Sequence, residues 1–567
     1  MKLLHHSVSQ RLSANAFLCS TSRYWALALT CALTSVLIWH SGAVLAEGIK
    51  VAPGSGNTRM DRAGNGVPVV NVATPNGKGV SHNTFRDYNV DRQGLILNNA
   101  RGKAADTRLG GRISANLNLR DRAAQLIINE VNGGSPSRLK GYTEVAGQRA
   151  NVVVANPFGI TCNGCGFINT PRATLSTGKP VFKDGELDHF AVDQGQVAIE
   201  GMGLDATEVD RFDIITRAAR LNAEVHANEL NVVAGANDVD ADSLATTRRT
   251  GTGEAPELAV DSSALGGMYA GSIRLVGTEA GVGVKVAGDM AASAGDIRID
   301  ANGQLTVANA ASTGRVLAKA RNATFEGNVH AGEAVELQAR DQLKVAGRLT
   351  SAGDIDLRAG QHLNNAGQVV AGIENDTLLA GSDLSIQTDQ LDNSGRLGAT
   401  QRLSVRADQT RNAGQMLAQE ILIDADQNLS NREGTISSDT IVIDAGRMDN
   451  SAAGLVAAEK NLVLDVADTL NNHTGQLQAE EAIVMTAASL NNTAGTVVGD
   501  TLALTTRHGL DNGEGMISAD GGNLRLQTDG RLDNTAGTIQ APNGGLFLSA
   551  HQVDNPGALC RPNASST

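Results

Sequence analysis

The second half of the chain repeats itself with a period close to twenty residues. An asparagine recurs at intervals of 19 to 22 residues, and a glycine follows each one by two to four residues. A fixed period of this length indicates one supersecondary unit stacked on copies of itself. The repeated asparagines are Asn393, Asn412, Asn431, Asn450, Asn472, Asn492, Asn512 and Asn534.

Each repeat supplies three short apolar segments. In one repeat these are Leu477 just after the glycine, the alternating pair Ile483 and Met485, and Leu490 before the next asparagine. Alternation with period two predicts strands with one buried face. The sequence therefore predicts an all-β fold, a right-handed parallel β-helix of about 25 turns. We expect asparagine at the corner because it tolerates left-handed backbone and can hydrogen-bond to its copies in neighbouring turns.

Composition narrows the kind of core and the kind of partner. Only 3% of the 567 residues are aromatic, so the core must be built from Val, Ile, Leu and Ala, which favours stacked strands. The net charge is −13. This argues against a nucleic-acid partner, because phosphate binding needs a basic surface.

The first 46 residues have the pattern of an extended signal peptide. The apolar run from Trp25 to Trp39 is too short to span a bilayer comfortably, and Val44 and Ala46 occupy the small-residue positions of a signal-peptidase site. We expect cleavage between Ala46 and Glu47. An uncleaved membrane anchor is the alternative.

A stretch between residues 151 and 178 differs from the repeats. An apolar run, Val152 to Val154, leads into turn signals at Asn156-Pro157 and at Asn163-Gly164, which predict two short strands joined through tight turns. Its segments ANPFGI and CNGCGFINTPR resemble the signature of the two-partner secretion domain of filamentous-haemagglutinin-type adhesins and contact-dependent growth-inhibition exoproteins. GVSHN, GLILNN and the segment from Leu265 to Gly288 extend the resemblance in the same order.

The resemblance implies a domain organisation. Residues 47–300 would form the secretion (haemagglutination activity) domain, 301–557 the haemagglutinin-type repeats, and 558–567 an irregular tail, which we interpret as a sign of truncation. A cap with extra strands would close the β-helix. We expect the aromatic residues of the secretion domain to pack inside it, namely Phe85, Tyr88, Tyr142, Phe158, Phe167, Phe182, Phe190, Phe212 and Tyr269.

The resemblance also implies partners and a location. The Sec machinery would export the chain to the periplasm, and an outer-membrane β-barrel transporter would then recognise it through Asn156, Pro157, Phe158, Gly159 and Ile160. The product would be secreted or displayed on a Gram-negative cell as an adhesin that binds host-cell or bacterial-surface receptors. The alternative is the front part of a growth-inhibition toxin without its C-terminal effector. We expect Asn156→Ala to block secretion while the domain stays folded.

Signals for catalysis are sparse. Cys162 and Cys165 form a single C-x-x-C pair, and zinc would need a second pair. In an exported protein a local disulfide is the preferred interpretation, with a thioredoxin-type redox role as the alternative. We expect no cofactor and no metal. A polysaccharide-degrading β-helix enzyme is a third possibility, for which the candidate carboxylates are Asp354, Asp356, Asp424, Asp426, Asp439 and Asp444.

Overall fold

The computed structural model describes residues 48–561, and every regular element in that range is a β-strand. None of the described residues belongs to a helix that is long and apolar enough to cross a membrane. The signal peptide and the cleavage site at Ala46 and Glu47 lie outside the described residues, so both remain predictions.

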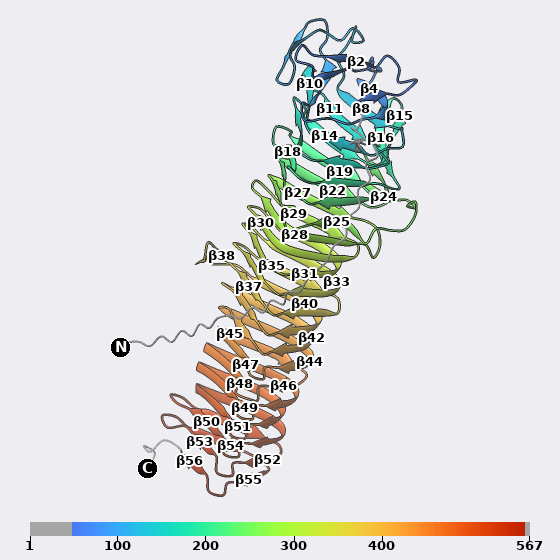
Figure 1. Cartoon of the computed structure of the whole chain (residues 1–567). Helices are drawn as coiled ribbons and strands as arrows, with labels where there is room; N and C mark the ends of the chain where they lie inside the picture. The colour runs from blue at the N-terminus through green and yellow to red at the C-terminus, as the bar shows by residue number, and fades with distance from the viewer. Residues whose placement is uncertain (1–47, 562–567) are drawn as a thin grey trace, which may run out of the picture. The chain divides into compact units, whose positions relative to one another are not determined.

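The strands wind into a parallel β-helix, which confirms the predicted fold class (Figure 1). The regular stacking is clearest in β47 (Leu455–Asn471), β48 (Gln476–Asn491) and β49 (Thr496–Asp511), which pair in parallel along their length. The coil has about 20 turns. This is fewer than the 25 expected, because the cap and the small sheets outside the coil use residues without adding turns.

One apolar core runs through the coil. A single cluster of buried side chains extends from Val70 to Ala541, and it contains the repeat residues predicted to face inward up to Ile539. The core crosses position 300 without a break: β29 (Ile297–Ala301) pairs with β27 (Ser272–Gly277) on one side and with β31 (Val316–Phe325) on the other. The two expected domains, 47–300 and 301–557, therefore share one continuous coil where they meet.

The repeated asparagines form the expected hydrogen-bonded ladder, but they do not adopt the expected left-handed backbone. Each is buried and donates its Nδ2 group to the Oδ1 atom of the asparagine one turn later, as Asn431 does to Asn450 at 2.7 Å. In the repeats from Asn431 onward, the left-handed backbone falls instead on the residue just before the glycine, for example on Glu433 (φ 61°) and Thr474 (φ 58°). The side-chain amide therefore accounts for asparagine at this corner, because none of these asparagines has a positive φ.

The N-terminal end of the coil is closed by antiparallel strands, as expected for a cap. β1 (Lys50–Val51) pairs with β4 (Val80–Asp87), and β2 (Arg59–Arg62) pairs with β3 (Pro68–Asn71). β3 then begins the parallel stacking by pairing with β5 (Leu95–Asn99).

A separate four-stranded antiparallel sheet covers one face of the coil near this end. It consists of β15 (Lys179–Lys183), β16 (Glu186–Val192), β23 (Asn237–Asp240) and β24 (Thr246–Arg248). Phe190 and Val239 of this sheet pack on Val153 and Val233 of the coil in a second apolar cluster. The expected extra strands are thus present, and apolar contact holds them to the coil.

The expectation that the aromatics are core residues holds for five of the nine. The buried ones are Phe85, Tyr88, Phe167, Phe190 and Phe212. Tyr142 and Tyr269 are only half-buried. The expectation is wrong for Phe158 and Phe182, which are 42% and 37% exposed because they lie on turns and strands outside the coil's core.

The C-terminal strands continue the coil. β56 (Leu559–Arg561) pairs in parallel with β53 (Thr538–Gln540), so regular stacking extends beyond residue 558, where an irregular tail was expected to begin. Leu548, in an inward-facing column, is 37% exposed because the coil strands that precede it cover it from one side only.

Candidate transporter-recognition turn

The candidate recognition residues form a tight turn between two strands of the coil. The turn joins β11 (Asn151–Ala155) to β12 (Ile160–Cys162). The Gly159 amide donates to the Asn156 carbonyl at 3.1 Å, and the Phe158 amide donates to Asn156 Oδ1 at 2.9 Å. Gly159 has a φ of 113°, which an L side chain rarely adopts.

Asn156 holds this turn from the inside. Its side chain is fully buried, and Nδ2 donates to the Ser135 carbonyl at 3.0 Å and to Ser137 Oγ at 2.9 Å. The same side chain thus fastens the turn to the preceding loop. Asn156→Ala removes three hydrogen bonds and leaves buried polar groups unsatisfied, so we now expect it to destabilise the domain as well as to affect secretion.

The five candidate residues differ in how accessible their side chains are to a partner. Pro157, Gly159 and Ile160 are buried together with Asn156, whereas Phe158 is 42% exposed. In the folded domain Phe158 is therefore the member of the motif that is open to contact, and the other four shape the turn that presents it.

The C-x-x-C pair lies directly after this turn. Cys162 ends β12 and Cys165 begins β13 (Cys165–Ile168), and the two residues are joined by a disulfide with Cα atoms 5.4 Å apart. Both side chains are buried. The motif sits between strands, and a thioredoxin-type role would need it at a helix N-terminus. The stretch forms four strands, β11 to β14 (Arg172–Ser176), where the sequence predicted two.

A buried ion network links side chains on three neighbouring strands of the coil. Asp213 is fully buried and accepts hydrogen bonds from Arg172 Nε at 2.6 Å, Arg211 Nε at 2.9 Å and Asn231 Nδ2 at 3.0 Å. This cluster was not predicted from the sequence. Its members come from three different strands, and the alternation of Arg211 and Asp213 along one strand was the only local signal.

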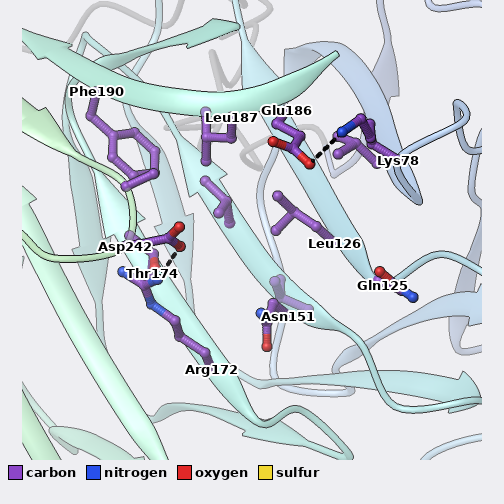
Figure 2. Close-up of a pocket in the computed structure, with 14 residues that line it drawn as sticks. Lys78, Gln125, Leu126, Asn151, Arg172, Thr174, Glu186, Leu187, Phe190 and Asp242 are labelled. Atoms are coloured by element: carbon purple, nitrogen blue, oxygen red, sulfur yellow. Dashed lines mark hydrogen bonds and ion pairs between the residues drawn. The ribbon is translucent and has the colours of Figure 1, made fainter. Parts of the chain in front are cut away.

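A hollow of about 300 Å³ opens between the four-stranded sheet and the coil (Figure 2). Lys78 pairs with Glu186 at 3.0 Å on one side of it, and Arg172 approaches Asp242 at 3.8 Å on the other. Because each charge lining the hollow has an opposite charge beside it, the site holds no net charge that would select an ion.

Three of the candidate carboxylates of the enzyme interpretation pair with a basic side chain. Asp356 pairs with Arg358 at 2.6 Å, Asp424 with Arg406 at 3.1 Å and Asp439 with Lys460 at 2.9 Å. Asp424 and Asp444 lie in register on adjacent turns. Within residues 48–561, no group of three or more His, Cys, Asp or Glu side chains is placed to hold a metal ion.

Comparison with known families decides what this architecture belongs to. Residues 49–307 match the TPS (two-partner secretion) secretion domain, and four segments between residues 311 and 558 match the haemagglutinin repeat. The chain belongs to the two-partner secretion exoproteins. The resemblance carried by the ANPFGI and CNGCGFINTPR segments is thereby confirmed.

Relatives of this exoprotein are much longer than the chain itself. It is 41% identical over 508 residues to the 16S rRNA endonuclease CdiA of Enterobacter cloacae, and 51% identical over 325 residues to the tRNA nuclease CdiA of Escherichia coli. These matches take in 83% and 57% of this chain, but only 14% and 10% of the relatives.

Among solved structures, the exoprotein resembles the crystal structure of a filamentous hemagglutinin secretion domain. The two are 34% identical, and the match takes in 53% of this chain and 94% of the other, with a TM-score of 0.42.

Proposed function

We propose that residues 49–307 address this exoprotein to a TPS outer-membrane transporter, and that the repeats form the coil displayed outside the cell. The match to the TPS secretion domain carries this proposal. Export through a partner transporter would deliver a chain that folds turn by turn, since each new turn buries its apolar residues on the turn before it.

Within this domain, the turn at Asn156 to Ile160 is the proposed recognition element. It is held rigidly by the buried Asn156 amide, and it points one apolar side chain, Phe158, toward solvent. A rigid turn with an exposed aromatic residue suits protein recognition, because little conformational entropy is lost on binding.

The test is secretion of variants together with a candidate partner transporter. Phe158→Ser should reduce the amount of protein in the medium at least tenfold while the purified domain keeps its circular dichroism spectrum. Phe182→Ser is the matched control, because Phe182 is similarly exposed at 37% but lies on the outer sheet. Normal secretion of Phe158→Ser would refute recognition through this turn in its folded form.

Two activities of the exported protein are candidates. The relatives named as CdiA nucleases favour a role in contact-dependent growth inhibition, in which this region would carry and display a toxic part. The matches to the haemagglutinin repeat favour adhesion. Binding of the secreted chain to sibling bacteria would support the first role, and agglutination of erythrocytes would support the second.

A further inference from the structure

The first hundred described residues differ in net charge from the rest of the described chain. Residues 48–150 contain 15 Lys and Arg against 7 Asp and Glu, a net charge of +8. Residues 151–561 contain 29 Lys and Arg against 52 Asp and Glu, a net charge of −23. All 15 basic side chains of the first segment are exposed. The acidic net charge of the whole chain therefore conceals a basic cap.

Three of these basic residues line an open hollow at the end of the coil. This cavity of about 400 Å³ is lined by Arg59, Arg62 and Arg112, by one carboxylate, Asp61, and by Leu117. Leu117 is 88% exposed, so its apolar side chain is free to contact a surface beside the arginines. Arg59 and Arg62 make no ion pair within residues 48–561, and the contact of Arg112 with Asp106 is long at 3.9 Å between two exposed groups.

Protection of a sheet edge accounts for only part of this pattern. Within the described chain β2 pairs only with β3, and its four residues are all exposed, so charges there discourage pairing with another chain. Charges of either sign would serve that purpose. The twofold excess of basic over acidic residues needs a different explanation.

We propose that the cap docks on an anionic membrane surface, with the arginines on lipid phosphates and Leu117 in the interfacial layer. Guanidinium groups match phosphate geometry and bind it through several donors. A charge spread over a whole cap suits an extended array of phosphates better than a single acidic pocket on a protein. The acidic remainder is repelled by the same surface, which would turn the coil away from the membrane.

This proposal rests on the proposed function, since export brings the cap to a membrane. It is tested on the purified chain that begins at Glu47, by co-sedimentation with vesicles of phosphatidylcholine containing 30% phosphatidylglycerol, against vesicles of phosphatidylcholine alone. The protein should bind the anionic vesicles and be released by 0.5 M NaCl. Failure here would leave secretion through the Phe158 turn untouched, so the two proposals can fail separately.

Variants locate the binding surface. The triple variant Arg59→Gln, Arg62→Gln, Arg112→Gln should lose roughly 100-fold in partitioning, from about fivefold per arginine, and Leu117→Ser should lose on the order of tenfold. The matched control is Arg340→Gln, Arg396→Gln, Arg411→Gln, which removes three exposed arginines from the repeats. Equal loss in the control, or equal binding to both kinds of vesicle, would overturn the proposal. So would arginine-dependent binding to the transporter's periplasmic part without vesicle binding, which would assign the cap to a protein partner.

Discussion

Asn472 Nδ2 donates to Asn492 Oδ1 across 2.7 Å, and both side chains are fully buried. The same bond recurs from turn to turn, so the amides form one continuous chain of donors and acceptors that all point the same way. The ladder begins at Asn365, whose Oδ1 atom is buried without a partner in the described chain because the preceding residue in its column is Val345. Such a chain ties each turn of the coil to the next.

Breaking the ladder in its middle should open the coil locally. Asn450→Ala removes the hydrogen bond from Asn431 Nδ2 and the hydrogen bond to Asn472 Oδ1. It thereby leaves Asn472 Oδ1 buried without its donor. We expect a loss of about 2–3 kcal/mol in the free energy of unfolding, with faster amide hydrogen exchange confined to the neighbouring turns. Asn328→Ala, on the outer surface of the same coil, is the control and should change stability by less than about 0.5 kcal/mol. Equal effects of the two would show that the ladder adds no stability.

The buried Asp213 should be far more sensitive than any carboxylate of the repeats. Asp213→Asn keeps the shape of the side chain but leaves Arg172 and Arg211 without their buried counter-charge. We expect it to cost about 3–5 kcal/mol in chemical denaturation. Asp424→Asn breaks an exposed pair with Arg406 and should cost at most about 1 kcal/mol. A cost below that of Asp424→Asn would mean that the network is not a source of stability.

The tyrosines should ionise at an unusually high pH. A chain beginning at Glu47 contains Tyr88, Tyr142 and Tyr269 and no tryptophan, so tyrosinate absorbance near 295 nm can be read without interference. The hydrogen bond to Asp205, together with partial burial, raises the pKa of Tyr142 to about 12. Burial raises the pKa of Tyr88 and of Tyr269 as well. We therefore expect little ionisation at pH 10, where free tyrosine is half ionised.

The same shift predicts how stability depends on pH. Because the pKa of Tyr142 is higher in the folded chain than in the unfolded one, its contribution is complete below pH 10 and is lost as the pH rises from 10 toward 12. Asp205→Asn should bring the titration of Tyr142 back toward pH 10. Asp289→Asn, which acts on Tyr269, should leave Tyr142 unchanged. An unchanged Tyr142 titration in Asp205→Asn would show that another group raises its pKa.

The fold could be predicted because the same apolar core positions recur in every repeat. The columns through Leu477 and Ile483 are specified by residues that recur every twenty positions, and a period-two pattern leaves one way to bury them. The asparagine corner was predicted for the same reason. Its backbone was not, because the side-chain ladder and the left-handed residue are neighbouring features of one turn, and spacing alone cannot separate them.

The turn from Asn156 to Ile160, which we propose as the recognition element, could be located from the sequence, but its exposed side chain could not be identified from it. The string from Asn156 to Ile160 marks a turn, yet which side chain faces solvent depends on Ser135 and Ser137, which lie some twenty residues earlier and one turn away. The Asp213 network was missed for a related reason. Its charges come from separate strands, and only the winding of the coil brings them together.

The sequence by itself thus determined the β-helix and the family of this exoprotein, since both follow from local patterns of spacing and motif. The tertiary structure alone decided what the surface presents. It buried Asn156 and exposed Phe158 and Leu117, and it gathered the arginines of the cap at one end of an acidic coil. The physical reason is that burial and local charge are properties of residues distant in the chain that become neighbours only when the turns stack.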